Sequence, residues 1–516
     1  MFAAWRLRDF ALELLLFMSE HFISRQDAHG DLLACAAYIA ESINGGEAKA
    51  AAIASVVPAY LERGNVDLAA ELANSVDDPF TRDRLLIAVA AKCADLDDDE
   101  YALQLADAIE EPGFQAQAFE RIGIVKANAG KLEKAREVAA LMSHPDSVLA
   151  SVAVKQAEAG DVAEAFKTID EIEYAGAAVS ALNAIAARKI KDENLDSLGV
   201  ILDRSVRGAS DIEHVEERIG ALIAIGNIFT ASGDNRRAVE TLEKARVEAE
   251  TLDNTHRDSL LGQVSLGFLY AGNMELADST LDSVSDKTQI ATVLYGFARD
   301  YWRKEEKDDA FEALEEAFAI LKSQRDIETR DSKARFSLMG QIAAQFAGFE
   351  KGERALEIAE SLEDDAQRTS ALSQIACISE TQNNIEISQH ALASLNEDAD
   401  RAFTLIGMSD AALDNGDNER AAELIGDAIA MIESIPQPSL KASASTEVFP
   451  RLIKLSEPQK ARNAFNSALS AIADIRDDSK RAATLATLNS AIEGSEFRIS
   501  DDEIVKLREL LSAQTV

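Results

Sequence analysis

The sequence repeats one short phrase in which a glycine is followed, five positions later, by an alanine. Gly accepts the left-handed backbone that ends a helix at little cost. An Asp or Asn directly after it can cap the next helix by accepting hydrogen bonds from free backbone N–H groups. The phrase therefore predicts an elbow between two helices. It occurs as RGNVDLAAEL (63–72), AGKLEKAREV (129–138), AGDVAEAFKTI (159–169), ASGDNRRAVETL (231–242), AGNMELADSTL (271–281) and NGDNERAAEL (415–424).

The alanine of this phrase marks a slot that recurs at a nearly constant step. The commonest step is 33 residues, and all steps lie between 30 and 45. A period in the thirties is typical of stacked helical hairpins. Alanine fills the slot at Ala69, Ala102, Ala135, Ala165, Ala238, Ala277, Ala310, Ala355, Ala421 and Ala461, and Leu198 and Ser388 fill two further slots.

An apolar pattern lies upstream of each elbow. Sixteen residues before the alanine stands a large apolar residue, and four residues later most units carry a small one, as in Leu222 and Gly226. Two residues at this spacing lie on one face of a helix. The pattern predicts a first helix whose small residue lets a neighbouring helix approach closely.

A second phrase joins one hairpin to the next and pairs an Asp with an Arg three residues later. We predict that the Asp is an N-cap and that the Arg forms an ion pair within the helix or between repeats; a binding role for the pair is the alternative. The phrases are LEDDAQR (362–368), LNEDADR (395–401) and IRDDSKR (475–481), with Asp365, Asp398 and Asp478 before Arg368, Arg401 and Arg481.

Departures from the 33-residue step predict joints between blocks of repeats. One long step contains a connector near 207–211, and another contains Pro436 and Pro438, which interrupt a helix. Near the end, Ser500 and Glu503 have the spacing of a capping box, which predicts a closing helix. The predicted organisation is N-terminal capping helices at 1–47, repeat blocks at 48–208 and 209–435, and C-terminal repeats with a capping helix at 436–516.

The pattern resembles the tetratricopeptide repeat (TPR), a helical pair of about 34 residues. Its consensus is matched in full by Leu222, Gly226, Gly233 and Ala238, and the resemblance covers roughly residues 48–490. It implies an all-α, right-handed α-solenoid (superhelix) of about twelve TPR-like helical hairpins. The Pro that usually follows the second helix is mostly missing here. Ile223 stands where members with a basic carboxylate clamp carry Lys or Arg, which argues against such a clamp.

The resemblance also implies where a partner would bind. In such solenoids the first helices line a concave groove, and outward positions on them determine recognition. The alternative is that these side chains only fill the inner wall of the superhelix. The residues at these positions are Asn128, Asn227, Leu266, Tyr270, Phe403 and Asp410.

The composition restricts the class of partner. The chain carries 91 acidic and 52 basic residues, for a net charge of −39. This charge disfavours nucleic acid and anionic membranes, and it favours basic protein or peptide partners. A salt-rich habitat could select the same acidic surface.

No sequence motif predicts a catalytic residue, a cofactor or a metal site. The chain lacks the glycine-rich phosphate-binding loops, the HExxH zinc motif and the GxSxG nucleophile motif. His21, His29 and Cys35 are the closest group of metal-ligand types, and their spacing fits no zinc pattern. We expect Cys35, Cys93 and Cys377 to be buried free thiols.

The N-terminus is the most apolar stretch, but Asp9 and Glu13 interrupt it before it reaches the ~18 residues of a membrane span. We predict that it is a helix capping the first repeat; a signal sequence or an anchor is the alternative. We accordingly expect a cytoplasmic protein, with an exported form left open.

These observations predict a protein–protein interaction scaffold that is not an enzyme and that presents a concave groove to peptide or protein partners. One alternative is a structural subunit of a larger complex or a homo-oligomer that self-associates through the apolar face of residues 2–18. A second is the sensor module of a signalling system, and a third is an enzyme in its own right.

Overall fold

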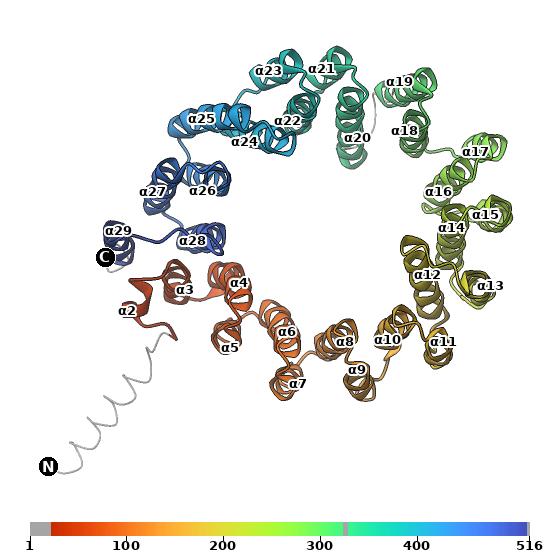
Figure 1. The fold of residues 1–516 in the computed structure, drawn as a ribbon, viewed down its shortest axis with the longest axis horizontal. Coiled ribbons are helices and arrows are strands. Elements are labelled where there is room, and N and C mark those ends of the chain that lie inside the picture. Colours follow the sequence, from red (N-terminus) through yellow and green to blue (C-terminus); the bar gives the residue numbers. More distant parts are fainter. Residues whose placement is uncertain (1–21, 324–328, 513–516) are drawn as a thin grey trace, which may run out of the picture. The chain divides into compact units, whose positions relative to one another are not determined.

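The computed structural model describes residues 22–323 and 329–512 (Figure 1). Over these residues the chain forms 28 α-helices and no strand. The predicted all-α repeat fold is confirmed, and the TPR-like hairpin is its unit. The N-terminal segment 2–18, predicted to cap the array or to mediate self-association, lies outside the described residues.

Twelve helical hairpins account for most of the described chain, and each joins a first helix to a second helix through an elbow. The first helices are α4 (Gly46–Glu62), α6 (Pro79–Asp95), α8 (Pro112–Asn128), α10 (Asp146–Glu158), α12 (Ala175–Lys191), α14 (Val215–Ala231), α16 (Arg257–Tyr270), α18 (Lys287–Arg303), α20 (Thr329–Gly348), α22 (Asp365–Thr381), α24 (Asp398–Asp414) and α26 (Pro438–Lys454). The second helices are α5 (Val66–Asn74), α7 (Asp99–Asp107), α9 (Leu132–Ala139), α11 (Val162–Asp170), α13 (Leu198–Ala209), α15 (Asn235–Glu250), α17 (Met274–Leu281), α19 (Lys307–Ser323), α21 (Gly352–Glu360), α23 (Ile385–Ala393), α25 (Asn418–Ser434) and α27 (Pro458–Asp474). Four helices lie outside these hairpins: α2 (Arg25–Ala28), α3 (Leu32–Ser42), α28 (Asp478–Ile492) and α29 (Asp501–Ser512).

The elbows have the geometry that the recurring phrase predicts. Between α14 and α15, Gly233 is left-handed with a φ of 86°, and the Asp234 N–H donates to the Phe229 carbonyl at 2.9 Å. The Asp234 carboxylate then accepts the Arg237 N–H at 3.1 Å and caps α15. All six glycines of the phrase are left-handed: Gly64, Gly130, Gly160, Gly233, Gly272 and Gly416.

Six elbows keep the left-handed residue and the hydrogen bond across the turn without a glycine. Glu305, between α18 and α19, has a φ of 65°, and the Glu306 N–H still donates to the Tyr301 carbonyl at 2.9 Å. A side chain in the left-handed region costs roughly 1–2 kcal/mol. The hairpin geometry therefore determines the backbone here, against the local preference. The left-handed residues of these elbows are Asp97, Glu193, Glu305, Glu350, Asn383 and Ser456.

The irregular steps of the repeat come mainly from differences in length among the second helices. Where the step is 33 residues or fewer, a second helix has 8 or 9 residues, as in α11 and α17. The long steps contain α13, α15, α19 and α25, with 12, 16, 17 and 17 residues. The helix is interrupted at 435–437, as Pro436 and Pro438 predict, and Pro438 begins α26, where its missing N–H costs nothing.

The Asp-x-x-Arg phrases form the predicted ion pairs, but their N-caps lie one residue earlier than predicted. Each phrase has two adjacent acidic residues; the first one takes the N-cap position, where Asp364 and Asp477 accept backbone N–H groups but Glu397 does not, and the second becomes the first helical residue. The ion pairs join Asp365 to Arg368, Asp398 to Arg401 and Asp478 to Arg481, and the N-caps are Asp364, Glu397 and Asp477.

Glycines allow close contacts between helices. A Cβ atom at Gly123 would lie 2.7 Å from Val148 of α10, and one at Gly296 would lie 2.5 Å from Leu266 of α16. Neither space admits a methyl group without movement. Gly123 is one of the small residues predicted on the packed face of the first helices, whereas Gly296 lies outside that pattern.

The described residues divide into two compact units. Unit 1 holds residues 22–118 and 396–512, and unit 2 holds residues 119–323 and 329–395. In unit 1, α28 packs against both α3 and α4, so two distant parts of the sequence share one core (Figure 1). The block boundaries expected at 48, 209 and 436 concern joints in the sequence and stay a prediction.

Candidate partner-binding site

A cleft in unit 2 contains two of the predicted recognition residues. Asn227, near the end of α14, and Tyr270, the last residue of α16, line one cavity of about 660 Å³. Asn227 is exposed, and 41% of the Tyr270 surface is accessible. The remaining lining residues are Thr230, Ala231, Arg299, Asp300 and Arg303.

Three consecutive first helices build this cleft with the residues of their last turns. α14 supplies an amide and a hydroxyl, α16 supplies the phenol, and α18 supplies two guanidinium groups. The arginines suit this position because the carbonyl end of a helix favours positive charge. The cleft therefore offers hydrogen-bond donors and a partly exposed aromatic ring side by side.

The negative charge in the cleft is already compensated. Asp300 is only 2% exposed and forms ion pairs with Arg303 and with Lys304, whose Nζ lies 2.7 Å from Oδ2. The Lys304 contact lacks hydrogen-bond geometry, so Coulomb attraction is what balances this oxygen. Arg303 also lies over the Tyr270 ring, with its Cζ 5.9 Å from the ring centroid.

Arg299 is exposed and forms no ion pair with any residue in the described ranges. Its guanidinium lies over the Tyr295 ring, whose centroid is 6.0 Å from Cζ. Its guanidinium therefore has no carboxylate partner within the described ranges, although the chain has almost twice as many acidic as basic residues.

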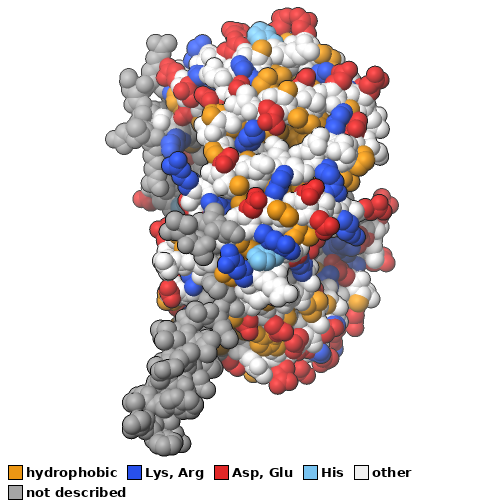
Figure 2. All heavy atoms as spheres, turned by 90° about the vertical axis from the view of Figure 1, so that its left-hand side faces the viewer, with side chains coloured by type: hydrophobic (Ala, Val, Ile, Leu, Met, Phe, Trp, Pro, Cys, Tyr) orange, Lys and Arg blue, Asp and Glu red, His pale blue; other side chains and the backbone are white. Residues whose placement is uncertain are grey.

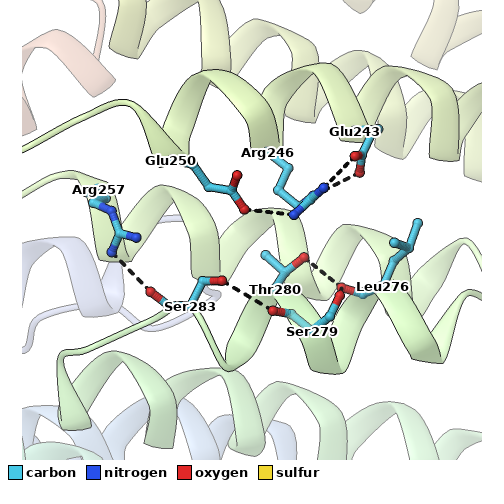
Figure 3. Close-up of polar contacts among 8 residues, drawn as sticks. All are labelled: Glu243, Arg246, Glu250, Arg257, Leu276, Ser279, Thr280 and Ser283. Atoms are coloured by element: carbon cyan, nitrogen blue, oxygen red, sulfur yellow. Dashed lines mark hydrogen bonds and ion pairs between the residues drawn. The ribbon is translucent and has the colours of Figure 1, made fainter.

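Arg246 on the second helix α15 shows the contrasting arrangement (Figure 3). It lies between Glu243 and Glu250 of the same helix and donates to both carboxylates, at 2.5 to 2.9 Å. The guanidinium of Arg246 is thus fully committed within its own helix, whereas that of Arg299 pairs with no carboxylate of the described residues.

The repeat pattern contains the signal that identifies both arginines. Asn227 stands five residues after the apolar residue that opens its repeat pattern, and Arg299 stands five residues after Leu294. Tyr270 stands nine residues after Leu261, and Arg303 stands nine residues after Leu294, so these two residues occupy the same position in their repeats. Applying one slot rule to every repeat would have placed the arginines beside the predicted residues.

The other predicted recognition residues have different surroundings. Leu266 is half-buried and packs over Gly296, so it contributes to the contact between α16 and α18. Asn128 is exposed at the end of α8. In unit 1, Phe403 is half-buried, and Asp410 accepts two hydrogen bonds from Arg451, at 3.0 and 2.7 Å. A partner role for these four residues stays a prediction.

The cysteines differ in burial. Cys35 and Cys93 are buried as expected, and desolvation raises their thiol pKa values to about 12 and about 11. Cys377 is only half-buried, because it lies one residue past Ala376, at the edge of the packed face of α22. His21 is outside the described residues; within them, no three His, Cys, Asp or Glu side chains are arranged to hold a metal ion.

On the face that Figure 2 shows, acidic residues are dispersed among side chains of other kinds. Figure 2 shows the left-hand side of Figure 1, where side chains of both signs alternate with apolar ones. The net charge of −39 therefore does not appear on this face as one acidic patch. Within the described ranges, no helix is long and apolar enough to cross a membrane.

Comparison with known proteins gives structural similarity alone. No protein-family model and no curated protein sequence matches the chain. Among solved structures, the Naa15/Naa10 complex bound to HypK-THB covers 95% of this chain and 84% of its own, at 15% identity and a TM-score of 0.32. Ton1535 from Thermococcus onnurineus NA1 covers 68% and 97%, at 14% identity and a TM-score of 0.25. The TPR-like repeats of a putative kinesin light chain from Podosopora anserina cover 43% and 97%, at 19% identity and a TM-score of 0.24.

Proposed function

We propose that this protein is a scaffold for protein–protein interaction and that the cleft between α14, α16 and α18 binds an extended peptide segment. The unpaired Arg299, exposed beside Arg303, Asn227 and Tyr270, is the observation that carries the proposal. Guanidinium groups bind carboxylates through paired, charge-assisted hydrogen bonds, and a nearby Tyr adds rigid contact area. The segment that fits best carries an Asp or Glu side chain or a free C-terminal carboxylate.

The sign of this site differs from that expected from the net charge. The net charge favours a basic partner through long-range steering, whereas the cleft itself exposes two arginines, and the carboxylate in its lining, Asp300, is compensated. Local pairing contributes more to a bound complex than long-range steering, which salt screens. We therefore favour an acidic segment in this cleft, and a basic partner stays a prediction for the rest of the surface.

The basic groups of this cleft come from α18, two repeats beyond the position where Ile223 breaks the carboxylate-clamp pattern. Ile223 itself is buried in α14, so it cannot contact a ligand in the cleft. The proposed site is thus assembled from three repeats and does not depend on a clamp within one of them.

Fluorescence polarisation with labelled dodecapeptides of acidic, neutral and basic composition tests the proposal. We expect acidic peptides to bind, and Arg299→Glu to weaken their binding by roughly tenfold to hundredfold, since hydrogen bonds to charged groups contribute ~1.5–3 kcal/mol. Peptides with a free and an amidated C-terminus separate a side-chain carboxylate from a terminal one.

Arg236→Glu is the matched control, since it makes the same charge change on α15, at a side chain that is 80% exposed and outside the cleft. This variant should bind acidic peptides within about twofold of the unmodified chain, because salt screens distant charges. Preferential binding of basic peptides, unchanged by Arg299→Glu, would rule out the proposed site.

A further inference from the structure

We propose that the two ends of the chain together form a thirteenth hairpin, in which α28 is the first helix and α3 is the second helix. The Arg63 side chain holds this composite hairpin closed within a single chain. The apolar end faces of the first and last repeats then cover each other, so neither is available to a partner or a second copy.

The contacts of α28 are those of a first helix within the repeat array. A first helix packs against its own second helix and against the first helix of the following repeat, as α26 packs against α27 and α28. Helix α28 packs in this way against α3 and α4, although both come from the opposite end of the sequence (Figure 1). Helix α3 also packs against α4, as α5 packs against α6.

Burial of α3 on nearly all sides agrees with this position. Its sequence, LLACAAYIAES, is apolar around most of the helix, and eight of its eleven residues are buried. A helix that is apolar all round needs neighbours on every side. At an open end of a repeat array, one face of such a helix would meet water.

The segment that follows α28 does not form a second helix that packs against α28. After α28, the chain runs without helix to Ser500, and Phe497 packs against Phe449 of α26 and Phe465 of α27. Helix α29 is held on α27 by the buried Glu503, which accepts from Arg462 at 2.7 Å and from Asn466 at 2.9 Å. This departure leaves space beside α28, and α3 occupies it.

Arg63 joins the three helices of the closure at one point. It stands at the C-cap of α4 and donates to Asn489 of α28 at 2.6 Å and to Glu493, the C-cap of α28, at 2.8 Å. It also donates to both oxygens of Asp31, the N-cap of α3, at 3.0 Å. Asn489 is only 2% exposed, so loss of Arg63 would leave its Oδ1 without this donor, although its amide nitrogen still donates to Glu493 at 2.9 Å.

A second contact shows how closely the ends approach. The Arg25 guanidinium, in α2, donates to the Leu511 carbonyl, in α29, at 3.4 Å. The composite hairpin is therefore flanked by helices from both ends of the chain, as a repeat inside the array is flanked by its neighbours.

Hydrogen exchange on the full-length chain tests this proposal, with Arg63→Ala as the variant. Local opening determines amide exchange, so a weakened closure should accelerate it in α3 and α28 together. We expect exchange in both helices to become roughly tenfold to hundredfold faster, with that in α14 to α18 unchanged. Arg354→Ala is the control, since Arg354 makes a similar two-bond contact with Glu315 in unit 2.

Two results would overturn the proposal. Fast exchange of α3 and α28 in the unmodified chain, as at fraying ends, would show that no closure exists. Protection that rises with protein concentration over a hundredfold range would show that a second copy supplies the pairing helix. Protection that is independent of concentration, and lost in both helices with Arg63→Ala, supports closure within one chain.

Discussion

The Leu242 side chain of α15 packs between two glycines of neighbouring first helices. A Cβ atom on Gly226 of α14 would lie 2.7 Å from Leu242 Cγ, and one on Gly267 of α16 would lie 2.8 Å from Cδ2. Leu242 is completely buried, so it cannot move away from either helix. This contact fixes the spacing between two repeats.

Gly226→Ala should destabilise the protein by about 1–2 kcal/mol, because overpacking at Leu242 outweighs the higher helix propensity of Ala. Urea unfolding measures the change. Gly220→Ala in the same helix is the control and should be neutral or stabilising, since nothing lies within 4 Å of the added Cβ. In a Leu242→Ala background the Gly226 change should lose its cost; a persistent cost there would contradict the contact as its cause.

Glu305→Gly should stabilise the chain by about 1 kcal/mol. Glu305 holds a φ of 65°, where a side chain is strained and Gly is not. Its counterpart Gly233→Ala should destabilise by a similar amount, since it introduces the same strain. Thermal unfolding of the two variants should shift in opposite directions, and shifts of one sign would contradict the shared elbow geometry.

Alkaline pH should destabilise the fold partly through Cys35. Burial, with help from nearby Asp31, raises the pKa of its thiol from 9.0 to about 12. The folded state therefore holds the proton more tightly than the unfolded state. The contribution of Cys35 is complete below pH 9 and is lost as pH rises toward 12, at about 1.4 kcal/mol per pH unit. Cys35→Ala should reduce this slope in urea unfolding, and an unchanged slope would contradict the role of this thiol.

Asp258→Ala should loosen the start of α18 at a cost of about 1 kcal/mol. The Asp258 carboxylate accepts the backbone N–H groups of Ser285 and Asp286, at 2.9 and 2.7 Å. In the same linker, the Ser283 carbonyl accepts from Arg257 at 3.1 Å (Figure 3). Hydrogen exchange should become faster at 285–290. The exposed Asp253, changed to Ala, is the control and should leave those amides unchanged.

Local sequence signals predicted the hairpins well because an elbow is built from residues close together in the chain. The Gly-Asp pair at 233–234 predicts both the end of one helix and the cap of the next. The same locality explains the error at the Asp-x-x-Arg phrases. Asp364 and Asp365 are chemically equivalent caps, and packing of the whole helix selects between them.

Contacts between residues that are far apart in the sequence could not be predicted from such local motifs. Arg63 and Asn489 are 426 positions apart, and neither lies in a motif that identifies the other. The position of Arg299 could have been predicted from the sequence, because Arg299 occupies the slot of Asn227 in a later repeat. That its charge is uncompensated follows only from the positions of the surrounding acids in three dimensions.

Half of the elbows contain a left-handed residue that is not glycine, and this variation limits how repeat arrays of this kind are recognised from their sequences. A search pattern that demands glycine at this point passes over hairpins such as those containing Glu305 and Ser456, although their backbones follow the same path. The capping hydrogen bond across the turn is the invariant property. Comparisons of backbone geometry, repeat by repeat, should therefore find relatives of this chain that letter-by-letter alignment misses.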